Sequence, residues 1–128
     1  MKPRTESYLK NAALSLTKGR DNLGIGHADE AARHAYYAAF HAAHALIFER
    51  TGKAPRTHGG VASEFRKIAR KNRAFTSDLL SFLSSAYIFK QTADYEAATA
   101  APISPQAAKD ALDRAEHIVK IVEKQLTP

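Results

Sequence analysis

Residues 29–50 read DEAARHAYYAAFHAAHALIFER, and this segment decides the fold. Its apolar residues recur at intervals of three and four, which is the period of an α-helix. The segment is followed by Thr51-Gly52-Lys53-Ala54-Pro55, where glycine and proline stop a helix. The sequence therefore predicts a long, strongly apolar helix over residues 29–50.

This helix has three faces when its residues are placed at steps of 100°. One broad face predicts the domain core and consists of Ala32, Tyr36, Ala39, Phe40, Ala43, Leu46 and Ile47. A second face has small side chains that let another helix approach closely, and it consists of Ala31, Ala38, Ala42 and Ala45. The third face is a histidine stripe, formed by His34, Tyr37, His41, His44 and Phe48.

The histidine stripe has three interpretations: metal ligands, proton-transfer groups, or packing residues at a subunit interface. A metal site is the poorest of these, because the stripe carries no Asp or Glu to act as a further ligand or base. Proton transfer and packing remain open at this point. Neither interpretation leaves the stripe facing bulk solvent, and no metal site is predicted.

On either side of residues 29–50, apolar spacing and helix start and stop signals predict four more helices. Strand signals are weak, and short connections favour a compact antiparallel bundle of four to five helices, an all-α fold. Ser104-Pro105 supplies an N-cap and a first-turn proline for the last helix, after an Ala-rich link. The other predicted segments are helices over residues 5–18, 59–71, about 76–95 and 105–126, with a loop over residues 19–27.

The composition is that of one ordinary domain, spanning residues 1–128, with 45% apolar and 25% charged residues. There is no cysteine, so disulfides, thiolate metal sites and cysteine nucleophiles are excluded and a reducing cytoplasm fits. We expect no secretion signal and no membrane insertion. The sequence has no Walker loop, dinucleotide fingerprint or paired-carboxylate motif of a conventional enzyme.

Positive charge is concentrated in one segment. The net charge is +6, and residues 50–73 contain eight Lys or Arg against one acid, Glu64. The predicted third helix turns a basic outer side away from the core, with Arg66, Lys67, Arg70 and Lys71. Such a segment favours RNA or an acidic partner protein, although a solvated helix face gives the same pattern.

Three pieces of the sequence resemble the HEPN domain: residues 36–43 (YYAAFHAA), residues 55–61 (PRTHGGV) and Ala93-Asp94-Tyr95. Their spacing covers nearly the whole chain. The resemblance implies a bundle of four or five helices that is commonly a dimer and is often encoded beside a minimal nucleotidyltransferase. It also implies that the chain is similar to toxins that cut RNA without metal or any other cofactor.

RNA-cutting members of that family carry an arginine and a histidine separated by four to six residues. Here Arg33 and His41 enclose seven residues, as do Arg50 and His58. In similar sequences an arginine often stands at the position of His34, which leaves two alternatives: either Arg33 has moved by one place or the function has weakened. Arg20 and His27 enclose six residues, but they fall in the predicted loop.

The resemblance makes His41 the candidate acid or base and Arg33 the candidate phosphate clamp, with His34 as a further candidate beside them. Cleavage of RNA by its own 2′-hydroxyl needs a base, an acid and a cation, which histidine and arginine can supply. Arg56 is a second candidate phosphate clamp, and His58 is a second titrating group at a glycine-rich helix start. A plain loop and N-cap is the alternative for residues 56–60.

Three functions remain open from the sequence. The first is a metal-independent ribonuclease toxin, working as a homodimer and neutralised by an antitoxin. The second is a subunit that binds a nucleotide or a minimal nucleotidyltransferase without catalysis. The third is a dimerisation module, and for the first two the predicted RNA or phosphate contacts are Arg56, His58, Arg66, Lys67 and Arg70.

Overall fold

The computed structural model describes residues 1–95 and 102–127, together with their side chains except those of residues 92–95. The described residues form helices and no strand, which confirms the predicted all-α fold. The Ala-rich link over residues 96–101 and the side chains of Ala93-Asp94-Tyr95 lie outside what is described. The helices are α1 (Pro3–Gly24), α2 (Ala28–Thr51), α3 (His58–Ala69), α4 (Ser77–Tyr95) and α5 (Pro105–Leu126).

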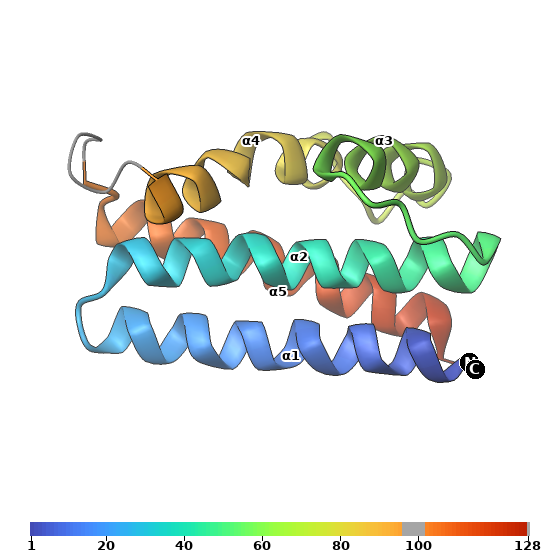
Figure 1. Cartoon of the computed structure of the whole chain (residues 1–128), viewed down its shortest axis with the longest axis horizontal. Helices are drawn as coiled ribbons and strands as arrows, with labels where there is room; N and C mark the ends of the chain where they lie inside the picture. Colours follow the sequence, from blue (N-terminus) through green and yellow to red (C-terminus); the bar gives the residue numbers. More distant parts are fainter. Residues whose placement is uncertain (96–101, 128) are drawn as a thin grey trace.

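Helix α2 is the central element of the bundle (Figure 1). It lies antiparallel to α1, with α5 behind the pair and with α3 and α4 along its opposite side. Among the described residues, it packs against all four other helices, whereas α1 contacts only α2 and α5. The N-terminal end of α1 and the C-terminal end of α5 lie at the same end of the bundle. Among the described helices, none has the length and apolar character that a membrane span needs.

The helix ends follow the sequence signals. Ser104 Oγ accepts a hydrogen bond from the Ala107 backbone N–H at 3.0 Å, and Pro105 occupies the first turn of α5. Thr57 caps α3 in the same way through the Gly60 backbone N–H, at 2.9 Å. Gly52 ends α2 in the left-handed conformation, with φ of 73°. These caps place His58 at the first position of α3.

The predicted loop over residues 19–27 is wrong for its first part, because α1 continues to Gly24. Gly19 is buried in the middle of the bundle instead of ending the helix. A Cβ atom at this position would lie 2.5 Å from Leu112 Cδ2 and 3.3 Å from His34 Cβ. Glycine is therefore needed here because α1, α2 and α5 approach one another closely.

The core faces of α2 agree with the helical spacing. The four alanines of the small face, Ala31, Ala38, Ala42 and Ala45, are fully buried. Tyr36, Leu46 and Ile47 of the broad face are also buried, while Phe40 is only half-buried. The side of α2 that no other helix covers completely carries the histidine stripe, and this leaves a surface for function.

Candidate functional site

A shallow groove between α1 and α2 holds two of the predicted catalytic residues. His34 and His41 line it together, with Tyr37 between them in the sequence. The groove has a volume of about 390 Å³, and its wall on α1 consists of Asn11, Leu14, Ser15 and Lys18. His34 and His41 are two helical turns apart, about 10 Å along the axis. Lys18, which the sequence pattern did not single out, adds a cation to this groove.

The imidazoles of His34 and His41 are available for proton transfer. Their nitrogens make no hydrogen bond within the described part of the chain and are not among its buried unpartnered atoms, so solvent reaches them. Burial lowers the pKa of His41. Burial also lowers the pKa of His34, assisted by the positive charge of Arg33. Both rings are therefore largely neutral at pH 7 and can accept a proton.

His44, the third histidine of the stripe, is a packing residue. Its ring lies edge-on between Tyr8, at 4.9 Å between centroids, and Phe40, at 4.8 Å. Both of its ring nitrogens are buried and have no hydrogen-bond partner within the described residues. Burial and the positive charges of neighbouring groups lower its pKa. The stripe thus divides into two accessible histidines and one enclosed histidine.

Arg33 is held apart from His41 within one chain. The two residues are about 12 Å apart along the axis of α2. The Arg33 guanidinium donates to Glu30 at 2.6 Å, one turn earlier on the same helix. The predicted phosphate clamp is thus already engaged with a carboxylate, and a single chain does not bring it to His41.

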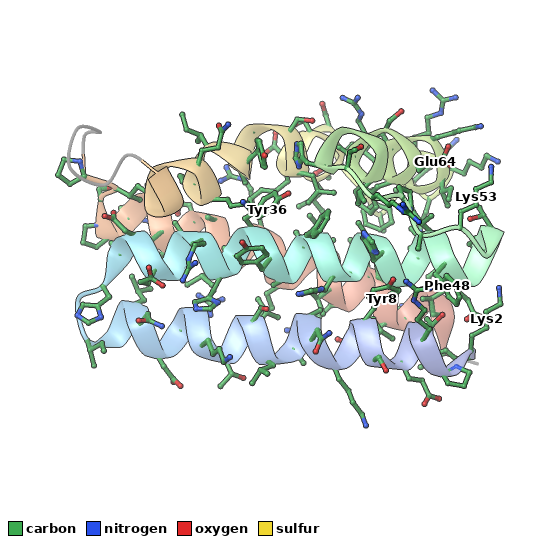
Figure 2. All side chains as sticks on the ribbon, viewed as in Figure 1. Lys2, Tyr8, Tyr36, Phe48, Lys53 and Glu64 are labelled. Atoms are coloured by element: carbon green, nitrogen blue, oxygen red, sulfur yellow. The ribbon has the colours of Figure 1, made fainter. Side chains whose placement is uncertain are left out.

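His58 forms a separate cluster where the start of α3 meets α2 and α4. Its Nδ1 atom lies 2.7 Å from the hydroxyl of Tyr36, which is buried on the side of α2 that faces α4 (Figure 2). Its ring stacks on Tyr87 of α4, at 3.9 Å between centroids and 16° between planes. Burial lowers the pKa of His58. The sequence placed His58 at a helix start but did not reveal either aromatic partner.

A basic groove lies between α3 and α4. It is formed by Ser63, Arg66, Lys67, Arg70 and Leu80 and has a volume of about 460 Å³. The three cationic side chains are exposed and make no ion pair with other described residues. This confirms the predicted basic outer side of the third helix. Arg56 is also exposed but lies in the link before α3, outside the lining of the groove.

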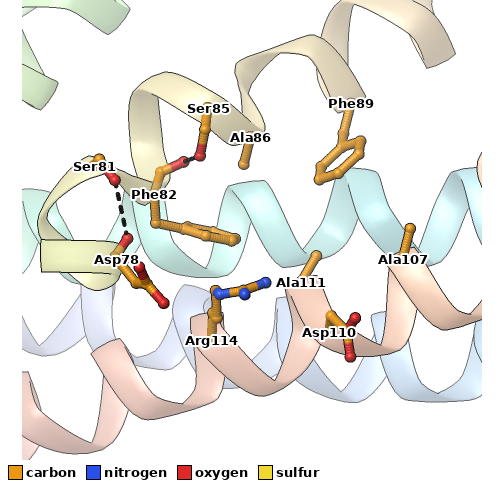
Figure 3. A pocket seen from close by; sticks show the side chains of 10 residues that line it. All are labelled: Asp78, Ser81, Phe82, Ser85, Ala86, Phe89, Ala107, Asp110, Ala111 and Arg114. Atoms are coloured by element: carbon orange, nitrogen blue, oxygen red, sulfur yellow. Dashed lines mark hydrogen bonds between the residues drawn. The ribbon is translucent and has the colours of Figure 1, made fainter. Parts of the chain in front are cut away.

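A further groove, between α4 and α5, was not predicted (Figure 3). Its volume is about 420 Å³, and the rings of Phe82 and Phe89 line it beside the guanidinium of Arg114. Asp78 and Asp110 add carboxylates to its wall. Helical spacing gave no sign of it, because Phe82 fits the pattern of a core residue of α4.

Arg20, the arginine of the Arg20–His27 pair whose spacing matches the family pattern, has a structural role. Arg20 lies on α1, and its guanidinium pairs with Asp113 at 3.0 Å and Glu116 at 3.3 Å, both on α5. His27 directly precedes α2, and its exposed side chain makes no capping bond. Among the described residues, no group of three or more His, Asp or Glu is arranged to hold a metal ion.

Comparison with known proteins agrees with the observed fold. The HEPN domain matches residues 5–125. "Putative toxin MJ0142" of Methanocaldococcus jannaschii is 29% identical over 96 residues, which are 75% of this chain and 65% of that protein. The chain thus spans slightly less than two thirds of the length of this curated relative. The crystal structure of TT1696 from Thermus thermophilus has the same fold, with a TM-score of 0.81, 23% identity, and coverage of 98% of this chain and 100% of that one. The chain belongs to the HEPN domain family.

Proposed function

We propose that this HEPN protein is the toxin of a toxin–antitoxin pair and that it cuts RNA without a metal ion. The observation that carries the proposal is the α1–α2 groove, where His34 and His41 present accessible nitrogens in the same groove as Lys18. The relative from Methanocaldococcus jannaschii, which carries the word toxin in its name, supports the biological role.

The chemistry uses the RNA's own 2′-hydroxyl as the nucleophile. Neutral His41 takes the 2′-hydroxyl proton as the oxygen attacks phosphorus. The minor protonated form of His34, whose pKa is lowered, donates a proton to the departing 5′-oxygen. The P–O5′ bond breaks, leaving a 2′,3′-cyclic phosphate and a 5′-hydroxyl. Lys18 stabilises the negative charge that develops on the phosphorane oxygens. Arg33 fills this role from a second subunit if its pair with Glu30 opens.

The basic groove on α3 supplies RNA affinity. Arg66, Lys67 and Arg70 make no ion pair with other described residues, so they can neutralise phosphates. Binding by such cations is independent of base sequence and falls as salt rises. Arg56, at the approach to α3, extends the same positive surface.

The active form in this proposal is a homodimer. The α1–α2 groove is shallow, and Leu14 on its wall is 51% exposed. A second copy over the groove covers Leu14 and Tyr37, excludes water from the histidines and brings a second Arg33 near the site. An antitoxin, such as a minimal nucleotidyltransferase, would neutralise the toxin by covering the same surface.

The test is a cleavage assay with purified protein, single-stranded RNA and a chelator. His41→Ala is expected to abolish cleavage and any toxicity on expression, without loss of helical circular dichroism. His27→Ala is the matched control, because His27 is exposed and makes no capping bond, and it is expected to leave cleavage unchanged. Equal activity of His41→Ala and wild type contradicts the proposed role of His41.

The second candidate is a binding subunit without catalysis. It is favoured by the engagement of Arg33 with Glu30, which removes the predicted clamp from the histidine groove. In that case the wild type binds RNA or a nucleotidyltransferase but cleaves no RNA, with or without metal. The cleavage assay therefore separates the two candidates.

A further inference from the structure

The geometry points to a second recognition site for single-stranded RNA, centred on His58, where a neutral imidazole held by Tyr36 and Tyr87 donates its Nε2–H to the strand. This inference rests on the proposed RNA substrate but adds a binding group that is separate from the α1–α2 groove. The cluster consists of His58, Tyr36 and Tyr87 and is called the His58 cluster below.

The hydrogen bond within the cluster fixes the position of the proton. Tyr36 is 1% exposed, and its hydroxyl has only His58 Nδ1 as a partner within the described chain, at 2.7 Å. If Nδ1 carried the proton and donated it, the buried Tyr36 O–H would have no acceptor, which costs about 1–3 kcal/mol. The Tyr36 hydroxyl therefore donates to Nδ1, and the ring proton resides on Nε2.

The remaining nitrogen of His58 is open to a ligand. Nε2 makes no hydrogen bond with any described residue, and it is not among the buried unpartnered atoms. The stack on Tyr87, at 3.9 Å, and the hydrogen bond to Tyr36 together orient the His58 ring. The cluster thus presents one N–H donor in a fixed direction and without a positive charge.

A fixed neutral donor suits recognition better than proton transfer. For Nε2 to act as a base, its proton would have to move to Nδ1 and leave the Tyr36 hydroxyl without an acceptor. Recognition needs no such rearrangement, because Nε2–H can donate directly to an acceptor atom of a base or sugar. The His58 cluster therefore recognises a nucleotide, and His34 and His41 carry out the proton transfers of the proposed cleavage.

The neighbouring basic groove favours a nucleic-acid strand as the ligand. Leu80 lines that groove and Tyr87 supports His58, and both belong to α4. They are two turns apart, about 10 Å along the helix, so a short single strand can reach both. Arg66, Lys67 and Arg70 then hold phosphates while His58 contacts an adjoining nucleotide.

The first arm of the test reads the proton position directly. Long-range ¹H–¹⁵N NMR spectra at neutral pH should show His58 as a single tautomer with the proton on Nε2. Tyr36→Phe removes the hydroxyl donor and should give a mixture of the two neutral tautomers. An imidazolium, or a proton on Nδ1 in the wild type, overturns the inference.

The second arm measures binding of a short, fluorescein-labelled single-stranded RNA. The double variant Tyr36→Phe/His58→Phe keeps the stacked rings and leaves no orphaned hydroxyl, and thermal melting checks that it folds. We expect its RNA affinity to fall about 3- to 10-fold, the effect of one hydrogen bond. Since the lost donor is neutral, the slope of log affinity against log salt should not change, whereas Arg66→Ala should reduce that slope by about one.

The outcomes separate this inference from the proposed function. RNA binding that depends on His58, in a wild type that cleaves nothing, supports the recognition site and refutes the ribonuclease. Cleavage by the wild type, with unchanged affinity in the double variant, refutes the recognition site alone. A wild type that fails to bind the RNA also refutes the recognition site. A smaller salt slope in the double variant than in the wild type shows that His58 acts as a cation, which refutes the neutral donor.

Discussion

The three histidines of the histidine stripe differ in the exposure of their ring nitrogens to solvent. His34 and His41 keep solvent-accessible nitrogens, whereas His44 lies between the rings of Tyr8 and Phe40 with both nitrogens buried. A charged imidazolium in such an enclosure loses its hydration and gains no hydrogen bond, so protonation is disfavoured. The enclosed ring therefore contributes packing, and it makes the stability of the protein sensitive to acid.

We predict that His44 destabilises the fold as the pH falls below about 6.5, the ordinary pKa of histidine in the unfolded chain. Burial lowers the pKa of His44 in the folded chain, so between the two values the unfolded state binds more protons. Above about pH 6.5 the titration of His44 does not change the free energy of unfolding. Below about pH 6.5 the free energy of unfolding decreases as the pH is lowered, until the pH is below the lowered pKa of folded His44. Urea unfolding at a series of pH values measures this loss.

The variant His44→Phe isolates the effect. Phenylalanine can keep the edge-on contacts with Tyr8 and Phe40 but cannot titrate. The loss of stability between neutral and mildly acidic pH should be smaller in His44→Phe than in the wild type, while His34, His41 and His58 still titrate in both. Identical pH profiles would show that His44 is not the enclosed titrating group described here.

At the scale of the helix, Gly19 determines how closely α1 approaches α2 and α5. Gly19→Ala adds a Cβ 2.5 Å from Leu112 Cδ2, and Leu112 is fully buried and has little room to move. Overpacking costs about 1–3 kcal/mol, and the better helix propensity of alanine returns about 1 kcal/mol. We expect the free energy of unfolding to fall by about 1 kcal/mol, as measured by urea denaturation.

Gly24→Ala is the matched control on the same helix. A Cβ atom added at Gly24 would have no neighbour within 4 Å, and this glycine does not have a positive φ. Only the helix propensity changes, so stability should stay constant or rise slightly. Equal effects of the two substitutions would refute the role of Gly19 as the point of close approach.

At the scale of the helix, we also predict that the cationic side chains of α3 contribute to RNA affinity. Replacing Arg66 and Arg70 by alanine should weaken binding of single-stranded RNA and lower the salt slope by about two, because two phosphate contacts are lost. Both side chains are exposed, so the melting temperature should change little. Lys10→Ala on α1 removes an exposed cation elsewhere and should leave the slope unchanged. A slope that is the same in all variants contradicts a phosphate role for α3.

Helical spacing and capping residues correctly predicted the features that depend on local interactions. The faces of α2, the cap at Ser104 and the basic side of α3 follow from residues close together in the sequence. Gly19 was misread because its role depends on Leu112, which lies on a distant helix. The partners of His58 were missed for the same reason, since Tyr36 and Tyr87 come from two other helices. The pairing of Arg33 with Glu30 is local, and a spacing of three between opposite charges was the available signal.

At the scale of the whole molecule, the bundle leaves the histidine groove uncovered on one side. We predict a homodimer through this face, with a mass by light scattering of about 28 kDa at micromolar concentration, twice the 14.0 kDa of one chain. Leu14→Asp places a charge on an exposed position of the groove wall and should shift the protein toward monomer without unfolding it. A wild type that is monomeric at all concentrations contradicts the dimer.

The central claim is metal-independent cleavage of RNA by the histidine groove, and the ends of the products test it most directly. Wild-type protein, incubated with single-stranded RNA in excess chelator, should yield fragments that mass spectrometry identifies by a 2′,3′-cyclic phosphate and a 5′-hydroxyl. His41→Ala, folded and dimeric, should yield none. Intact RNA with the wild type, or the same fragments with His41→Ala, would contradict the account.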